Sequence, residues 1–566
     1  MKLRLPFSMK TLRDDAVAGL VLGVQSVPDG LANGLLAGIN PLYGLYGYLV
    51  GTFTGAVFTS SAFMAVQATG AMAMVIADVP AVHGAADSSR ALFTLSILVG
   101  IFMLLAGFFK LGTVLRFVSN AVMVGFLNAV GVNIILGQLA SLTGYEANGS
   151  NRVLRAIDTL LHPGELHLPT LFIGVTTIIL IVLLERTRLG SMGMVVAVVI
   201  TSAVAAGLGW DVAQLNHIAQ VPNALPLPQL PVLGLVPVLL VPAVALAFVG
   251  LVQGAGISAN YPNPDGSYPD PSRDFIGQGA ANVACGIFQG MPVGGSLSAT
   301  ALGKTAGAKS RQALLIAALV MAVTILLFAR LVGEVSMPAL AGLLMLVGFR
   351  TISPDALQSV WRTGALQRAV LGATFVLTLI IPLQFAVLVG VALSVVLHTV
   401  SQSNQVTIKR REFDGQGNVV ESDPPEVLPA NEVVVLQPYG SLFFAAAPVF
   451  DLALPDIDET SRNSVVVLRL RGYSDLGTTF MDVLKRYAEG LGAVGSRLVI
   501  VSGDDRVLEQ LAVTGVTDAV GPDGIYAGDE RVGATVRRAN DEAAAWVERN
   551  LETNGAAAEP SERSEG

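Results

Sequence analysis

The sequence has few charged residues and almost no cysteine. Only 13% of its 566 residues are charged, whereas about a quarter are charged in soluble globular proteins, and 52% are hydrophobic. The single cysteine, Cys285, excludes a disulfide within the chain, and its apolar surroundings are typical of a small core residue. This composition indicates a polytopic α-helical membrane protein.

Motifs for catalysis and for nucleic-acid binding are also scarce. The five histidines are scattered, no metal-ligand spacing occurs, and GSLSATALGKT has Ser298 where a phosphate-binding loop needs its first glycine. Acidic residues outnumber basic ones by 27 to 12 in residues 412–566, so this region has no basic nucleic-acid footprint. We therefore expect no enzyme, no metal, no cofactor and no nucleic-acid partner.

Residues 15–404 contain fourteen apolar segments, and we predict that they form the transmembrane domain. Residues 1–14 are predicted to be a cytoplasmic N-terminal segment. A membrane span needs about 20 apolar residues, and the apolar runs are separated by charges, prolines and polar turns. The segments are 16–38, 42–58, 66–78, 91–109, 117–140, 169–184, 190–208, 235–258, 275–290, 297–307, 312–330, 333–349, 366–381 and 383–403.

The basic residues predict the orientation of these segments. If the N-terminus is cytoplasmic and every segment crosses the membrane, 18 of the 22 Lys and Arg in residues 1–411 face the cytoplasm. An excess of Lys and Arg in cytoplasmic loops is the general rule for membrane proteins. We therefore expect a multi-pass protein of the cell membrane (inner or plasma) with a cytoplasmic N-terminus. The four basic residues that would face the opposite side of the membrane are Arg90, Arg152, Arg155 and Arg330.

Two segments are too short to cross the membrane as full helices. They are VQATGAMAMVIAD at 66–78 and SLSATALGKTAG at 296–307, the third and the tenth in order. Their separation by seven positions predicts two seven-span halves folded as inverted repeats. The positive N-terminal ends of the two half-helices would then face one pocket that suits an anion. The alternative is a pair of helices packed through small residues.

Ordered motifs in both halves carry a family resemblance. They are PDGLANGLLAGINPLYGLYGYLVGTFTGAVF at 28–58 and GIFQGMPVGGSLSATALGKTAGAKSRQA at 286–313. Both resemble signatures of the SulP anion transporters, the sulfate permease family. The resemblance implies seven-plus-seven inverted repeats, core and gate subdomains that move against each other, an anion site between the third and tenth spans, and a homodimer.

The same resemblance implies which residues form the anion site. Backbone N–H groups would do most of the binding, and the hydroxyls of Thr69 and Ser298 would act as donors. Each hydroxyl could instead bond back to its own helix backbone, as Ser and Thr commonly do in membrane helices. The implied substrate-binding residues are Gln67, Ala68, Thr69, Gly70, Ser296, Leu297 and Ser298.

Three positions depart from the family pattern. Ala299 stands where the family often has arginine, which removes a fixed positive charge from beside the pocket and favours weak or monovalent binding, or neutralisation of the anion by a co-transported cation. Gln253 stands where many members have an acidic residue, so it cannot supply a carboxylate for a cation. Asp29 stands where the family has Gln or Glu after the first-span proline.

Asp29 is expected near the middle of the first span. An ionised carboxylate there costs on the order of several kcal/mol unless it is paired or hydrated, and no Lys, Arg or His lies in the core of a predicted span. We therefore predict that Asp29 faces the aqueous pocket and, with its repeat counterpart Gln253, forms the ion-coupling site. Protonation would relieve repulsion of the anion and couple H⁺ to anion entry. The alternatives are that Asp29 caps a helix break at Pro28, or that it binds Na⁺.

The acidic C-terminal region has the pattern of a soluble α/β domain. Short apolar strands alternate with amphipathic helical stretches, which favours an α/β layer. We expect strands at 433–440, 464–470 and 497–503 and helices at 480–493 and 505–516.

This region resembles the cytoplasmic STAS domain of the sulfate permease family. We predict the domain at residues 431–547, after a polar linker at 405–430. Residues 548–566 are small, polar and charged, and we expect them to be disordered.

These features together predict a secondary active transporter of a small inorganic or carboxylate anion. The classes considered are sulfate, bicarbonate and carboxylates, with H⁺ or Na⁺ as the coupled ion, the lipid bilayer as the surroundings and a homodimer as the assembly. Two other hypotheses are an uncoupled anion channel or exchanger, and a membrane-tethered STAS signalling protein. Saturable flux that depends on a coupling ion separates the first from the second, and deletion of residues 431–566 tests the third.

Overall fold

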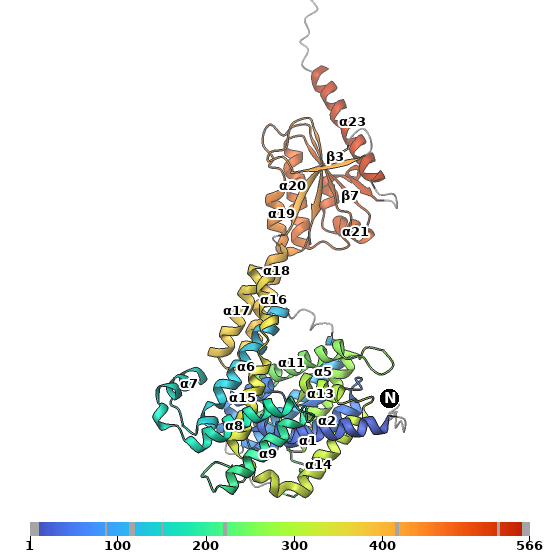
Figure 1. Ribbon diagram of the computed structural model, residues 1–566. Helices are drawn as coiled ribbons and strands as arrows, with labels where there is room; N and C mark the ends of the chain where they lie inside the picture. The colour runs from blue at the N-terminus through green and yellow to red at the C-terminus, as the bar shows by residue number, and fades with distance from the viewer. Residues whose placement is uncertain are drawn as a thin grey trace, which may run out of the picture. The chain divides into compact units, whose positions relative to one another are not determined.

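Two units make up the chain, Met1–Ser394 and Val395–Gly566 (Figure 1). The computed structural model describes residues 11–84, 88–112, 119–149, 151–218, 223–403, 405–413, 418–528 and 533–556. The first unit is almost entirely helical, and the second contains a six-stranded sheet.

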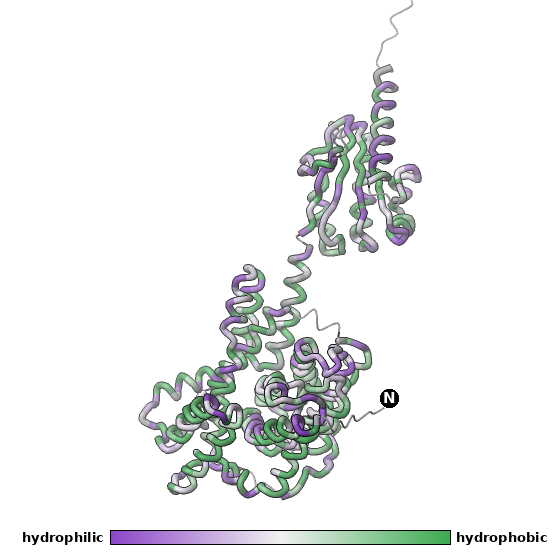
Figure 2. Tube along the Cα trace, turned by 45° about the vertical axis from the view of Figure 1, so that its right-hand side comes forward, coloured by the Kyte–Doolittle hydropathy of each residue, from purple (hydrophilic) through white to green (hydrophobic). Residues whose placement is uncertain are grey.

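The polytopic helical architecture predicted for the first unit is confirmed. Each of the fourteen predicted segments contains a helix, and Figure 2 shows how strongly hydrophobic many of these helices are. Six helices of the described residues are long and apolar enough, by length and composition, to cross a membrane. The helices of the fourteen predicted segments are, in order, α1 (Leu12–Leu36), α2 (Pro41–Phe58), α3 (Gly70–Ala77), α5 (Ser88–Phe108), α6 (Asn120–Thr143), α8 (Leu168–Glu185), α9 (Met192–Gly207), α11 (Val236–Asn260), α12 (Pro271–Ile287), α13 (Leu297–Thr305), α14 (Gln312–Gly333), α15 (Met337–Thr351), α17 (Ala365–Ile380) and α18 (Leu383–Ser403).

Four shorter helices lie between these segments and were not expected from hydropathy. They have few apolar residues or only one apolar face, so a search for continuous apolar runs passes over them. The predicted start of the fifth segment at 117 lies outside the described residues. The additional helices are α4 (Pro80–Gly84), α7 (Arg152–Leu161), α10 (Leu215–Ile218) and α16 (Pro354–Thr363).

Capping residues explain where some helices begin. The side chain of Asp270 accepts hydrogen bonds from the N–H groups of Ser272 and Arg273, and Pro271 occupies the first position of α12. Proline is favoured there because an N–H at the first helical position would lack an intrahelical partner. α12 therefore begins four residues before the predicted boundary, which was placed at the apolar Phe275.

Helices α1 and α2 approach each other closely at glycines. A Cβ atom on Gly44 would lie 2.1 Å from the carbonyl oxygen of Gly30 and 2.8 Å from the nitrogen of Gly34. Any side chain at position 44 would therefore push the two helices apart, and small residues are what allow such approach between membrane helices. This packing sets Asp29 on α1 beside Tyr48 on α2.

The two short segments each contain the predicted half-helix, and a three-residue strand that was not predicted precedes each one. β1 (Ala65–Gln67) leads into the eight-residue α3, and β2 (Gly294–Ser296) leads into the nine-residue α13. At about 1.5 Å per residue neither helix can cross a bilayer core of roughly 30 Å. The strands pair antiparallel, with Val66 opposite Gly295. One element from each half of the unit thus meets its counterpart, as in an inverted repeat.

The helices of the first unit pack in two sets. We call α1, α2, α5, α11, α12 and α14, with the two half-helices, the core group, and α6, α7, α8, α9, α15, α16 and α17 the gate group, because members of each set pack mainly on one another. α18 joins the gate group, since Gly390 lies against Thr374 of α17 and Val122 of α6. Half-helix α3 also touches α6, so it lies where the two groups meet.

The second unit contains the predicted α/β domain. Its strands β5 to β8 run parallel, and β3 and β4 are added antiparallel at one edge, in the order β4-β3-β5-β6-β7-β8. The three predicted strands and two predicted helices are all present. The elements are β3 (Thr407–Phe413), β4 (Val419–Ser422), β5 (Val433–Tyr439), β6 (Val465–Arg469), β7 (Arg497–Ser502), β8 (Ile525–Ala527), α19 (Ala447–Ala453), α20 (Thr478–Ala493), α21 (Asp505–Val513), α22 (Val516–Val520) and α23 (Ala534–Ala556).

Two boundary predictions for the C-terminal region were wrong. The interval 405–430, predicted as a linker, contains β3 and β4, because β3 pairs with β5 from the domain itself. Residues 548–556, predicted to be disordered, continue helix α23, which packs Val536, Ala539, Ala543 and Val547 against the sheet. The polar composition of the tail concealed this helix (Figure 2). Residues 557–566 lie outside the described residues.

Candidate functional site

A cavity of about 410 Å³ lies beside the starts of the two half-helices. The core group contributes residues of α1, α2, α3, α11 and α13, and the gate group contributes residues of α6, α9 and α15. The cavity thus lies between the two groups. Its lining residues are Gln25, Asp29, Asn33, Tyr48, Ala68, Thr69, Gly70, Ala71, Leu127, Val130, Ile134, Met194, Gln253, Ser296, Leu297, Ser298, Leu343, Val347, Arg350 and Thr351.

The half-helices present their N-terminal ends to this cavity. Each is capped by one hydroxyl: Thr69 accepts a hydrogen bond from the Met72 N–H at 3.3 Å, and Ser296 accepts one from the Ala299 N–H at 3.3 Å. The other N–H groups of a first helical turn have no intrahelical partner. Together with the positive ends of the two helix dipoles, such groups favour a negatively charged ligand.

Six of the seven residues predicted for the anion site line the cavity. They are Ala68, Thr69, Gly70, Ser296, Leu297 and Ser298. Three of them also form polar contacts there: the Thr69 hydroxyl donates to Gln253 Oε1 at 3.1 Å, and the Ser296 and Ser298 hydroxyls lie 3.2 Å apart.

Gln67 is the exception among the predicted site residues. Its side chain is fully buried, and its amide nitrogen donates to the hydroxyls of Ser26 at 3.0 Å and Thr52 at 3.1 Å. Gln67 lies in strand β1, whose side chains alternate between the two faces of the strand. It therefore points into the packing of α1 and α2 and does not line the cavity.

Asp29 lines the cavity and is held by α2. The Tyr48 hydroxyl donates to Asp29 Oδ2 at 2.8 Å, and the Asn33 amide donates to the Tyr48 oxygen at 2.9 Å and to the Asp29 carbonyl oxygen at 3.0 Å. Helix α1 continues through Pro28, so there is no helix break at that point for Asp29 to cap. The carboxylate is thus oriented by a tyrosine, and it faces the same space as the half-helix starts.

Ala299 does not line the cavity. Its side chain is 8% exposed and packs with Leu22, Ala65 and Leu314 between α1, α13 and α14. The alanine side chain at this position is therefore part of the helix packing beside the start of α13.

Arg350 is a cavity residue that sequence reasoning missed. It lies in the last turn of α15, and both of its terminal nitrogens bind the carboxylate of Glu185, the last residue of α8. The arginine follows an apolar run, and a charge at such a position is typical of the end of a membrane span. Among the described residues that line the cavity, one is acidic, Asp29, and one is basic, Arg350.

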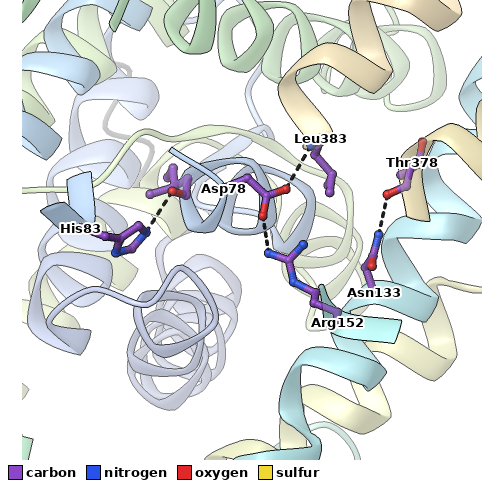
Figure 3. A network of polar contacts seen from close by, with 7 residues as sticks. Asp78, His83, Asn133, Arg152, Thr378 and Leu383 are labelled. Carbon is purple, nitrogen blue, oxygen red and sulfur yellow. Dashed lines mark hydrogen bonds and ion pairs between the residues drawn. The ribbon is translucent and has the colours of Figure 1, made fainter. Parts of the chain in front are cut away.

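A polar network connects α3 to the gate group (Figure 3). Asp78, which ends α3, accepts hydrogen bonds from Arg152 Nη2 of α7 at 2.6 Å and from the Leu383 N–H of α18 at 3.0 Å. Within the gate group, Asn133 of α6 donates to the Thr378 carbonyl oxygen of α17 at 2.8 Å. The bonds of Asp78 therefore cross from one group to the other.

A cavity between two half-helices of opposed repeats is the arrangement of secondary-transporter folds. A family model described as "Sulfate permease family" matches residues 12–374, and one described as "STAS domain" matches residues 425–537. The chain belongs to the sulfate permease family. It is a multi-pass membrane protein with a C-terminal STAS domain.

Two named relatives agree with this assignment. "Bicarbonate transporter BicA" of Synechocystis is 25% identical over 527 residues, which cover 89% of this chain and 91% of that protein. "Sulfate transporter 4.1, chloroplastic" of Arabidopsis thaliana is 23% identical over 540 residues, which cover 90% of this chain and 78% of that protein.

Two solved structures share the fold. The structure of SLC26A9 superimposes with a TM-score of 0.82 at 19% identity, covering 97% of this chain and 93% of that chain. The transmembrane domain of the cyanobacterial bicarbonate transporter BicA superimposes with a TM-score of 0.60 at 23% identity, covering 69% of this chain and 98% of that chain.

Proposed function

We propose that this protein is a secondary active transporter of a small anion of the sulfate, bicarbonate or carboxylate class, driven by symport with H⁺. The observation that carries the proposal is the cavity at the starts of α3 and α13. Backbone N–H groups and the hydroxyls of Thr69 and Ser298 surround a space that two helix dipoles make favourable for an anion. Relatives named as sulfate and bicarbonate transporters support the anion classes.

The coupled proton is assigned to Asp29. Its carboxylate lies in the same cavity as the proposed anion site, so its negative charge opposes anion binding and its protonation removes that opposition. The hydrogen bond from Tyr48 keeps the carboxyl oriented toward the cavity. Gln253, its repeat counterpart, positions Thr69 through a hydrogen bond and cannot itself carry the proton.

Transport requires that the cavity open alternately to the two sides. Its walls come from the core group and the gate group, so movement of one group against the other would transfer the anion across the membrane. The N-terminus and the STAS domain are assigned to the cytoplasm from the distribution of basic residues. The family resemblance supports a homodimer.

The Asp29→Asn variant tests this function in proteoliposomes. Asparagine keeps the size of the protonated acid, but its side chain cannot take up or release a proton. We therefore expect anion counterflow at equal pH to persist and accumulation driven by a pH gradient to be lost. Asp14→Asn, the same change at the exposed start of α1, is the matched control and should accumulate anion like the wild type. Gradient-driven accumulation by Asp29→Asn would refute the assignment of the proton.

A further inference from the structure

The described lining of the cavity contains a single basic side chain, that of Arg350. It lies on α15 in the gate group, whereas the half-helix starts and Asp29 lie in the core group. Its side chain lines the cavity and is 44% exposed, so a solute in the cavity can approach it. A cation on a wall lined mainly by apolar and neutral groups acts on any charged solute that enters the cavity.

The charge of Arg350 is partly neutralised by Glu185. Arg350 Nη1 lies 3.0 Å from Glu185 Oε1, and Nη2 binds Oε2, which is the two-pronged geometry typical of arginine with a carboxylate. The Glu185 side chain is 20% exposed and is not among the described cavity-lining residues. The acid therefore lies behind the arginine and reduces the field that the arginine projects into the cavity.

We propose that Arg350 is the cationic group that attracts anions into this cavity, and that Glu185 attenuates it so that the pair sets the preference between monovalent and divalent anions. The inference rests on the proposed function and adds a determinant of substrate charge to it. The energy of an anion in the field of Arg350 is proportional to the anion's own charge. A change in that field must therefore alter the affinity for sulfate by about the square of the factor for nitrate.

The alternative role for the pair is a structural tie between α8 and α15. The two roles predict opposite results for the two partners. If the pair only ties the helices, removing either partner breaks the same contact and weakens the protein in the same way. If the pair sets the field in the cavity, Glu185→Gln strengthens the field and Arg350→Gln weakens it.

The experiment compares apparent affinities of the full-length protein in detergent, read from the rise in thermal midpoint with sulfate and with nitrate. We expect Glu185→Gln to raise the affinity for sulfate by about tenfold and that for nitrate by about threefold, at low ionic strength where screening is weak. Arg350→Gln should lower both affinities, and the affinity for sulfate should fall more than the affinity for nitrate. Arg350→Lys should retain most of the affinity, because it keeps the charge without the two-pronged contact.

Arg362→Gln is the matched control, since it removes one arginine from the neighbouring helix α16 at a position outside the described cavity lining. It should change neither affinity. The inference would be overturned if Glu185→Gln and Arg350→Gln lost anion affinity equally, or if both variants had the same affinities as Arg362→Gln. In either case, anion binding by the wild-type protein would leave the proposed function intact. A wild-type protein that binds neither sulfate nor nitrate would overturn this inference, and failure to bind bicarbonate and small carboxylates as well would overturn the proposed function.

Discussion

Loss of the Asp78 carboxylate should release the gate group from α3. Asp78 receives a hydrogen bond from Arg152 Nη2 at 2.6 Å and one from the Leu383 N–H at 3.0 Å, and both donors belong to gate-group helices. The side chains of Arg152 and Asp78 are 18% and 16% exposed. In Asp78→Asn the side chain keeps its shape and one acceptor oxygen, but it loses the charge that pairs with arginine.

The size of the effect follows from these contacts. A hydrogen bond to a charged group contributes about 1.5–3 kcal/mol, and partial exposure of the pair to solvent reduces this value. Because asparagine can still accept from the Leu383 N–H, we expect a loss of about 1–2 kcal/mol from the conformation in which the groups are joined. That energy corresponds to a shift of roughly 5- to 30-fold in the equilibrium between joined and separated states.

Thiol accessibility of the cavity measures this shift. Cys285 is fully buried and is the single cysteine, so Cys285→Ser provides a background for one reporter. Leu297→Cys places that reporter on the cavity wall, where the native side chain is 42% exposed. In proteoliposomes, Asp78→Asn should raise the rate of modification by an impermeant thiol reagent from the side of the membrane on which α7 lies, by about 5- to 30-fold.

A matched control separates this effect from damage to α7. The carboxylate of Asp158 binds the Tyr145 hydroxyl and the Asn148 N–H, both within the segment around α7, so Asp158→Asn should leave the rate unchanged. Arg152→Gln should reproduce the effect of Asp78→Asn, and the double variant should add little, because both remove one contact. An unchanged rate in Asp78→Asn, or an equal rise from both sides, would refute the proposed connection.

Two further predictions concern packing and acidity. Gly44→Ala should reduce the folded fraction of the protein in size-exclusion chromatography, because its Cβ would lie 2.1 Å from the Gly30 carbonyl oxygen; normal yield and thermal midpoint would contradict this. In the second unit, the Tyr439 hydroxyl, followed by Arg411, holds the pKa of Glu421 below its usual value. A lowered folded-state pKa stabilises the fold above the unfolded-state pKa, and this contribution disappears as pH falls through the folded-state pKa. Thermal denaturation should therefore show a smaller loss of stability in acid for Tyr439→Phe than for the wild type, and equal losses would contradict the assignment.

Sequence patterns determined the helical class, the fourteen segments and the two half-helices. These are local properties: an apolar run long enough to cross a bilayer can be recognised without knowing its neighbours. The same holds for the strands of the α/β domain, whose continuous apolar runs indicate burial on both faces. The edge strands β3 and β4 were missed because their existence depends on pairing with a partner elsewhere in the chain.

The candidate site divides in the same way. The isolated acid Asp29 could be recognised from local sequence, and the hydroxyls of Thr69 and Ser298 from the family resemblance, whereas the capping of the half-helices by Thr69 and Ser296 came from the structure. Burial of the Gln67 side chain, by contrast, depends on contacts with Ser26 and Thr52 from other helices.

The charges around the cavity were decided by tertiary structure. The sequence alone established that Asp29 needs a pocket or a partner, because an isolated carboxylate is costly in a membrane. It could not establish that Tyr48 donates to that carboxylate, or that Arg350 faces the same cavity with Glu185 behind it. Those relations depend on the distances between helices that are far apart in the chain, and such distances arise only when the apolar faces and glycine contacts pack together.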